Sequence, residues 1–150
     1  MKKKLISLVG LFLIPISIGI PIGIGTFTFY YGKGHSYLLD DPKACINCHV
    51  MNDNYKSWIQ SSHKKVASCN DCHAPDDFVG KWMSKAFNGL MHSYAFTTGN
   101  YPDPIKIKKF NKNIVKNQCI SCHQNIFQQG KHSIETYNCT TCHKSAGHRR

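Results

Sequence analysis

At 150 residues the chain is long enough for one ordinary domain, but it is poor in the apolar runs that would build an ordinary core. Its net charge of +11 is of the kind found in chains that bind nucleic acid or anionic lipid. The basic residues are scattered and form no stripe with aromatic residues, so we expect no nucleic-acid partner.

The N-terminal segment predicts a membrane anchor. Residues 5–31 carry no charged side chain and consist mostly of Ile, Leu, Phe, Val and Gly. These 27 residues exceed the roughly 20 that a helix needs to cross a bilayer. A cleaved signal peptide would have a shorter apolar region and a small-residue cleavage site, which are absent here. We therefore divide the chain into an anchor helix, residues 1–32, and a second domain, residues 33–150.

The residues that flank this segment predict its orientation. Lys2, Lys3 and Lys4 precede it, Tyr30 and Tyr31 end it as an interfacial aromatic belt, and Lys33 follows as a basic stop. The positive-inside rule places the three N-terminal lysines in the cytoplasm and residues 33–150 on the opposite side of the membrane.

The eight cysteines form four pairs with identical spacing, and a histidine directly follows each pair. The four motifs are Cys45/Cys48/His49, Cys69/Cys72/His73, Cys119/Cys122/His123 and Cys139/Cys142/His143. C-x-x-C-H is the attachment signature of c-type haem, in which two thiols bond to the porphyrin and the imidazole ligates the iron. The sequence therefore predicts four covalently bound haem c groups. Their propionates would lower the net charge from +11 to about +3.

Two other uses of the cysteines are less favoured. Zinc ribbons use C-x-x-C pairs, but they give no reason for four following histidines. A disulfide framework suits an oxidising compartment, yet C-x-x-C pairs bridge poorly to one another in stable frameworks.

The spacing of the motifs predicts two pseudo-repeated dihaem units. Cys45 and Cys69 lie 24 residues apart, and Cys119 and Cys139 lie 20 apart. A cysteine-free segment, Asp76 to Lys116, separates the two pairs.

Short helices are expected to carry each of the motifs, and the fold class is mostly α with much irregular structure. A further helix is expected over Ser57 to Ser68. Another is expected over Phe78 to Phe96, where apolar residues recur with helical spacing. Residues 101–104 then form a turn or an extended segment. With so few apolar residues, the porphyrins themselves would form the interior.

Any further iron ligands must be residues other than the four motif histidines. Met51 lies two residues after His49, and a thioether ligand raises the reduction potential relative to a second histidine. His63 precedes Cys69 by six residues, and His132 precedes Cys139 by seven, so the two are rivals for the same kind of role. His148 follows Gly147 near the end of the chain, whereas His35 beside the membrane boundary is expected to be a surface residue.

These features together resemble the NapC/NirT/NrfH family of tetrahaem quinol dehydrogenases. The shared features are one N-terminal helix, four C-x-x-C-H motifs, C-x-x-C-H-x-M at the first motif and a terminal C-H-x-x-x-G-H. Residues 85–97 are similar to the segment between the haem pairs of that family. The shortness of the chain most resembles the small membrane subunit of cytochrome c nitrite reductase.

The resemblance implies a role for individual residues. Met51, rather than His49, would ligate the first iron, and His73 would ligate the second opposite a lysine of the partner. The third iron would take His123 and His148, and the fourth would take His143 and His63. Menaquinol would bind beside the first haem with the help of Lys85 and His92.

The resemblance also implies a function. The chain would be a quinol dehydrogenase subunit in a hetero-oligomeric complex of anaerobic respiration. It would draw electrons from the membrane quinol pool and pass them to a periplasmic pentahaem nitrite reductase for nitrite ammonification. It would sit in the bacterial cytoplasmic membrane as a single-pass protein with a cytoplasmic N-terminus and a periplasmic haem domain.

Two alternatives to this function stay open. The chain could serve another periplasmic reductase, such as a nitrate reductase, or be an electron carrier and anchor without a quinol site. It is not expected to be the nitrite-reducing subunit itself, because it has no C-x-x-C-K motif.

Overall fold

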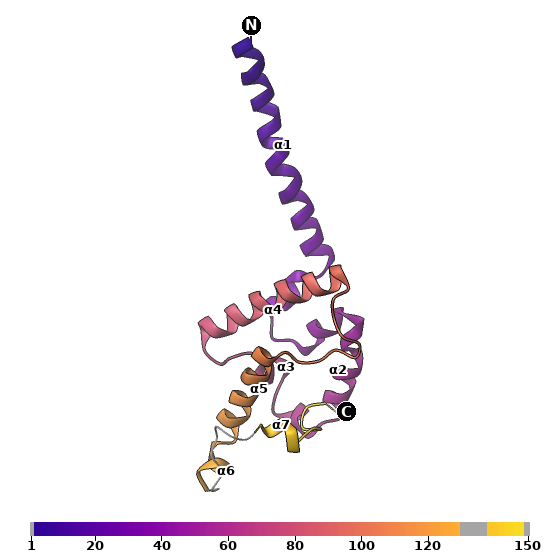
Figure 1. Cartoon of the computed structure of the whole chain (residues 1–150), viewed down its shortest axis with the longest axis vertical. Helices are drawn as coiled ribbons and strands as arrows, with labels where there is room; N and C mark the ends of the chain where they lie inside the picture. Colours follow the sequence, from indigo (N-terminus) through magenta and orange to yellow (C-terminus); the bar gives the residue numbers. More distant parts are fainter. Residues whose placement is uncertain (1, 130–137, 149–150) are drawn as a thin grey trace. The chain divides into compact units, whose positions relative to one another are not determined.

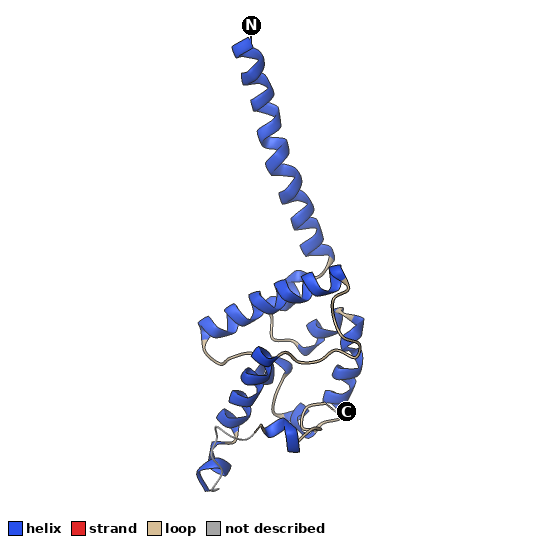
Figure 2. Cartoon of the chain, viewed as in Figure 1, coloured by secondary structure: helices blue, strands red, loops and turns tan. Residues whose placement is uncertain are grey.

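The computed structural model describes residues 2–129 and 138–148, with side chains described over 10–126 and 138–148. The described residues form helices joined by turns and irregular segments, and no strand occurs among them (Figure 2). The predicted fold class, mostly α with much irregular structure, is confirmed.

The helices are named in chain order as in Figure 1. The α-helices are α1 (Lys2–Tyr31), α2 (Asn52–Ile59), α3 (Cys69–His73), α4 (Phe78–Thr98), α5 (Lys109–Cys122), α6 (Gln124–Gln129) and α7 (Cys139–Cys142). Four 3-10 helices complete the set: η1 (Gly34–Leu38), η2 (Pro42–Asn47), η3 (His49–Met51) and η4 (Ser62–Lys65).

The chain divides into two compact units, residues 1–39 and residues 40–150. The first unit consists of α1 and η1. Within α1, Gly10–Tyr31 has a mean hydropathy of 1.9, and it is long and apolar enough to cross a membrane. Its large apolar side chains, from Leu11 to Tyr31, are exposed on all sides, as lipid-facing side chains are.

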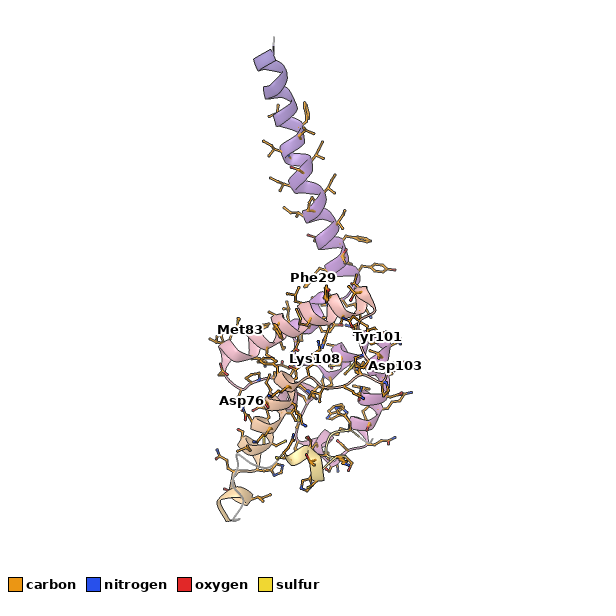
Figure 3. The ribbon with its side chains drawn as sticks, in the orientation of Figure 1. Phe29, Asp76, Met83, Tyr101, Asp103 and Lys108 are labelled. Atoms are coloured by element: carbon orange, nitrogen blue, oxygen red, sulfur yellow. The ribbon has the colours of Figure 1, made fainter. Side chains whose placement is uncertain are left out.

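Helix α1 is followed by a sharp turn. Lys33 adopts the left-handed conformation, with φ of 53°. Gly34 then passes so close to the ring of Phe29, labelled in Figure 3, that a Cβ atom at this position would overlap the ring. A glycine is therefore required at this close approach unless the ring moves.

Helix α4 has clear local start and stop signals. The side chain of Asp77 accepts a hydrogen bond from the N–H of Gly80 at 2.6 Å, which caps the first turn. Gly99, with φ of 68°, ends the helix in the left-handed conformation. The helix spans Phe78–Thr98, close to the predicted Phe78 to Phe96.

The helix predicted over Ser57 to Ser68 is wrong in its extent. Helix α2 begins earlier, at Asn52, and ends at Ile59. The chain then folds back, because the indole N–H of Trp58 donates to the carbonyl of Ala67 at 3.1 Å. A continuous helix would separate two residues nine apart by about 13 Å along its axis. The tertiary bond is therefore incompatible with the predicted helix.

The second unit buries very little of its own apolar surface. Its buried apolar residues among the described side chains are Ala44, Ala74 and Ile114, and none of the large side chains described is fully buried. A polar contact is buried beside them: the amide of Gln118 on α5 donates to the carbonyl of Ala74 at 2.5 Å and to Asp76 at 2.7 Å. The protein alone thus supplies only a small part of the interior that a unit of this size needs.

Candidate functional site

Three of the four C-x-x-C-H motifs have both cysteines on one short stretch of α-helix. The second motif occupies α3, the third ends α5 and the fourth begins with α7. Residues three apart on a helical turn lie on the same face. The two sulfurs of each of these pairs can therefore reach neighbouring positions on one porphyrin edge, and the following histidine lies beside them.

The first motif departs from the prediction that a short helix carries each motif. Cys45 lies in η2, but Cys48 follows the end of that helix in an extended conformation, with φ of −98° and ψ of 116°. The next helix, η3, begins only at His49. The physical reason is that 3-10 helices are rarely longer than a few residues, so the chain breaks between two of them at Cys48.

The break at Cys48 still leaves the first pair of thiols on one turn of the chain. The backbone N–H of Cys48 donates to the carbonyl of Cys45 at 3.4 Å, which closes the turn between them. The side chain of Cys48 is exposed, as are those of Cys122 and Cys142, whereas the first cysteine of every pair is half-buried. Each pair thus has one sulfur closer to the interior and, in three of the pairs, one at the surface. The role of Cys48 in haem attachment stays a prediction.

Side-chain caps hold the short motif helices at fixed points. Asp41 accepts a hydrogen bond from the N–H of Lys43 at the start of η2, at 2.9 Å. Ser68 and Asp71 form a capping box on α3. Asn138 caps α7 by accepting from the N–H of Thr140 at 3.3 Å. Because a helix of four to six residues is unstable alone, these caps are what define the motif geometry locally.

The thiols of successive motifs lie next to one another. A hydrogen bond between Cys45 and Cys69 lowers the pKa of Cys45 to about 7 and raises that of Cys69. Burial raises the pKa of Cys119 to about 11, and nearby thiols of Cys139 and Cys72 raise it too. The attachment points thus adjoin in chain order, from the first motif to the fourth. Once the sulfurs are thioethers, this titration disappears.

Two histidines outside the motifs are oriented as metal ligands usually are. The Nδ1 of His63 lies 2.8 Å from the carbonyl of Ala146, and the Nδ1 of His148 lies 3.0 Å from the carbonyl of Asn54. A carbonyl can only accept, so each Nδ1 donates, and in the neutral ring this leaves the lone pair on Nε2. A hydrogen bond from the other ring nitrogen is the usual support of a metal-bound imidazole.

Both of these histidines lie beside histidines of the motifs. The ring centroids of His63 and His123 are 6.3 Å apart, and those of His73 and His148 are 6.1 Å apart. These neighbours differ from the ligand pairs that the family resemblance implies, so the pairs stay predictions. His73 keeps exposed surface, but the protein around it desolvates the ring and, with a smaller effect of His148, lowers its pKa to about 4. A neutral ring is the form that binds iron.

The remaining ligand candidates occupy different settings. Met51 and His49 share the short helix η3, where Met51 is half-buried and His49 is exposed. His143 follows α7 and is exposed, as is His35. His132 lies outside the described residues.

Lys85, which the sequence analysis assigns to a quinol site, lies close to the first attachment point. Its ammonium group is near enough to Cys45 to act on the charge of that thiol. The ammonium group also lies 5.2 Å from the centre of the Trp82 ring. His92 follows two helical turns later on the same face of α4. Burial and the charge of Lys108 lower the pKa of His92, which favours its neutral form.

The sequence analysis missed Asp40. Its carboxylate accepts hydrogen bonds from Lys81 at 2.6 Å, from Lys85 at 3.0 Å and from Asn70 at 2.7 Å. Asp40 therefore joins helix α4 to the second haem motif. No local sequence pattern could have identified it, because its hydrogen-bond partners are 30 to 45 residues away in the chain. The one signal in the sequence is that Asp40 is the first acidic residue of the chain.

The residues present fit haem c. The paired thiols lie on single turns of the chain, and the hydrogen bonds at Nδ1 of His63 and His148 leave the Nε2 of each ring as the ligand atom. An apolar groove of about 520 Å³ separates α4 from α5, lined by Pro75, Gly80, Met83, Ser84, Phe87, Phe110 and Ile114. Such a groove and the near absence of buried apolar side chains are expected of a polypeptide that wraps a large flat apolar group.

Comparison with known proteins identifies the family of the chain. Residues 1–118 match the sequence model of the NapC/NirT cytochrome c family, N-terminal region. These residues include the apolar helix, the first two motifs and α4. The chain belongs to this family. It is therefore a membrane-anchored c-type cytochrome that binds haem covalently.

Individual relatives extend the similarity. The chain is 41% identical to the cytochrome c-type protein NrfH of Wolinella succinogenes, over 86% of this chain and 80% of that protein. It is 32% identical to the cytochrome c nitrite reductase subunit NrfH of Nitratidesulfovibrio vulgaris, over 74% and 69%. A chain in the crystal structure of a cytochrome c nitrite reductase NrfHA complex bound to the inhibitor HQNO has a TM-score of 0.64 and 30% identity, with 86% of each chain covered.

The Asp40 network predicts a pH-dependent contribution to stability. Hydrogen bonds from Lys81 and Lys85 lower the pKa of Asp40 from 3.8 to about 2. Its stabilising effect should therefore be complete above about pH 4 and disappear as the pH falls towards 2. Asp40 is half exposed, so we expect Asp40→Asn to cost less than about 1 kcal/mol at pH 7.

Thermal unfolding of the haem-loaded protein at pH 7 and pH 2 measures this effect. The melting temperatures of wild type and Asp40→Asn should differ at pH 7 and converge at pH 2. Asp53→Asn, at an exposed position in α2, serves as the control. An equal difference at both pH values would mean that Asp40 acts through shape and not through its charge.

Proposed function

We propose that this chain is the quinol dehydrogenase subunit of a nitrite-reducing complex. It oxidises menaquinol in the membrane and passes the electrons through four haem c groups to a periplasmic pentahaem nitrite reductase. The similarity to NrfH of two bacteria and to a chain of the NrfHA complex carries the proposal. The four C-x-x-C-H motifs support the haem count. Residues 1–32 form the anchor with a cytoplasmic N-terminus, and residues 33–150 form the periplasmic haem domain.

The proposed iron ligands are those that the family resemblance implies. Met51 ligates the first iron, and His73 ligates the second opposite a lysine of the partner reductase. His123 and His148 ligate the third, and His143 and His63 ligate the fourth. The hydrogen bonds from Nδ1 of His63 and His148 support their roles. His132 is the alternative to His63.

Haem c supplies a one-electron redox centre whose potential depends on its axial ligands and surroundings. The side chains of α4 bind the quinol and manage its protons. The Lys85 ammonium group, held by Asp40 beside the first motif, donates a hydrogen bond to one quinol oxygen. His92, with its lowered pKa, is neutral at pH 7 and can accept a proton from the hydroxyl group. Two protons and two electrons leave each quinol, and the protons are released on the periplasmic side.

The adjoining attachment points support a relay in chain order. Cys45 contacts Cys69, and Cys119 contacts Cys139. The thiols of Cys72 and Cys122 are also close to each other. Electrons that enter at the first haem can therefore pass between neighbouring haems and leave at the second or a later one.

Replacing His63 tests the ligand set. His63→Ala should convert one haem of four from low-spin to high-spin or weakly ligated iron, because its sixth ligand is removed. The absorbance and magnetic circular dichroism spectra measure this change, and the haem content should be unaltered because the cysteines remain. His35→Ala is the control, since His35 is exposed. A spectrum that stays entirely low-spin would assign the position to His132.

Replacing Lys85 tests the quinol site and the function together. In liposomes that contain the chain, the partner reductase and a menaquinol analogue, Lys85→Leu should slow quinol-dependent nitrite reduction at least tenfold, about 1.4 kcal/mol of transition-state stabilisation. Lys81→Leu removes the neighbouring salt bridge to Asp40 but no group proposed to touch quinol, so it should keep most of the activity.

The wild-type chain decides between the candidate functions in the same assay. Coupled quinol oxidation and nitrite reduction supports the proposal. Haem reduction by quinol without electron transfer to the nitrite reductase would indicate another periplasmic acceptor, such as a nitrate reductase. Failure of quinol to reduce the haems would leave an electron carrier or anchor without a quinol site.

A further inference from the structure

Three side chains from distant parts of the second unit meet at Asp40. Its carboxylate accepts hydrogen bonds from the ammonium groups of Lys81 at 2.6 Å and Lys85 at 3.0 Å, and from the side-chain amide of Asn70 at 2.7 Å. We call Asp40, Lys81 and Lys85 the Asp40 cluster. It contains two cations and one anion, so one positive charge is left uncancelled at pH 7.

The Asp40 cluster lies beside the attachment points of the first two haems. Asn70, which donates to Asp40, directly follows Cys69 in the second motif. Lys85 is close enough to Cys45 of the first motif to act on the charge of its thiol. Cys45 and Cys69 are also hydrogen-bonded to each other. The charges of the cluster therefore act on the surroundings of both haems that these two motifs attach.

The cluster is partly shielded from water. The side chain of Lys85 is 16% exposed and that of Lys81 is 29% exposed, whereas that of Asp40 is half exposed. Near a protein surface, charges interact as if the dielectric constant were about 20, compared with about 80 in bulk water. Salt weakens the interaction of exposed charges further. The charge of the cluster can therefore reach the neighbouring haems, and its effect should depend on ionic strength.

A fixed charge beside a haem changes the reduction potential of that haem. Reduction adds one negative charge to the haem. A nearby cation therefore stabilises the reduced form and raises the potential, and a nearby anion stabilises the oxidised form and lowers it. Charge and hydrogen bonding around the cofactor are means by which a protein sets its potential. Two lysines without a counter-ion would thus raise the potentials of the first two haems.

We propose that Asp40 holds down the reduction potentials of the haems attached at the first two motifs, by cancelling the charge of one of the two lysines beside them. The proposal rests on the covalent haem of the family, and it does not depend on quinol chemistry. If the proposed function also holds, Asp40 prevents electrons from being retained at the first haem. A potential raised too far at that haem would oppose transfer to the next one.

Two variants that break the same ion pair change the charge in opposite directions. Asp40→Asn keeps the shape of the side chain and removes the negative charge, so the potentials of the two haems should rise. Lys81→Met removes one positive charge from a side chain of similar length, so the same potentials should fall. The double variant Asp40→Asn/Lys81→Met has the net charge of the wild-type cluster. Its potentials should return close to the wild-type values.

Redox titration of the purified, haem-loaded chain measures these changes without quinol or a partner reductase. The electrode exchanges one electron with each haem, and the absorption bands report the reduced fraction. In each single variant, the ratio of reduced to oxidised haem at a fixed potential should change at least threefold. This change is about 28 mV, since a tenfold change is about 59 mV for a one-electron centre. High salt should reduce both shifts.

A purely structural role gives a different pattern. If Asp40 only holds the helices in place, both single variants should shift the potentials in the same direction, and the double variant should not restore them. This result would overturn the proposal. Unchanged potentials in both single variants would show that the haem propionates, and not Asp40, neutralise the lysines, and would also overturn it. Quinol oxidation is not measured, so neither result bears on the proposed function.

Discussion

Covalent attachment of haem to single turns of the chain is the interaction on which the rest of this structure depends. The described part of the second unit buries only Ala44, Ala74 and Ile114 among its apolar residues. Three small contributions to burial cannot balance the conformational entropy lost when a unit of this size becomes ordered. Covalently bound haem supplies the missing apolar interior, and we propose that four porphyrins do so, each held by two sulfurs from one turn. The polypeptide is then free to use short capped helices and irregular segments.

Polar contacts join the helices of the second unit, a role that apolar packing has in most domains. Gln118 joins α5 to the end of α3 through Ala74 and Asp76, and Asp76 is labelled in Figure 3. Asp40 joins α4 to α3 through Lys85 and Asn70. The lysine proposed to bind quinol is therefore fixed to the same network as the second haem motif. Such a network can keep the proposed quinol site and the first two haem attachment points at constant distances from one another.

Sequence patterns predicted the parts of the fold that depend on local chemistry. Helix α4 and the helices of three motifs follow from spacing. The Nδ1 hydrogen bonds found for His63 and His148 are those expected of the ligands that the sequence suggested. At Cys48 the prediction of a motif helix was wrong, because the C-x-x-C-H pattern fixes the spacing of the sulfurs but not the backbone between them.

The features that sequence patterns missed depend on contacts between residues distant in the chain. The break after Ile59 follows from the bond of Trp58 to Ala67, and the role of Asp40 follows from its bond to Lys85. The apolar periodicity of α4 predicted which residues share one face of the helix, but not what that face contacts. An apolar stripe looks the same whether it meets a core, a porphyrin or lipid.

Thermal unfolding by circular dichroism, on the chain made with and without cytochrome maturation, tests the central claim most directly. The haem-loaded chain should show Soret absorption equivalent to four haems and unfold in a cooperative transition. The second unit of the haem-free chain should show no cooperative transition, because it lacks an interior. A colourless chain with the same cooperative unfolding and melting temperature would contradict the account.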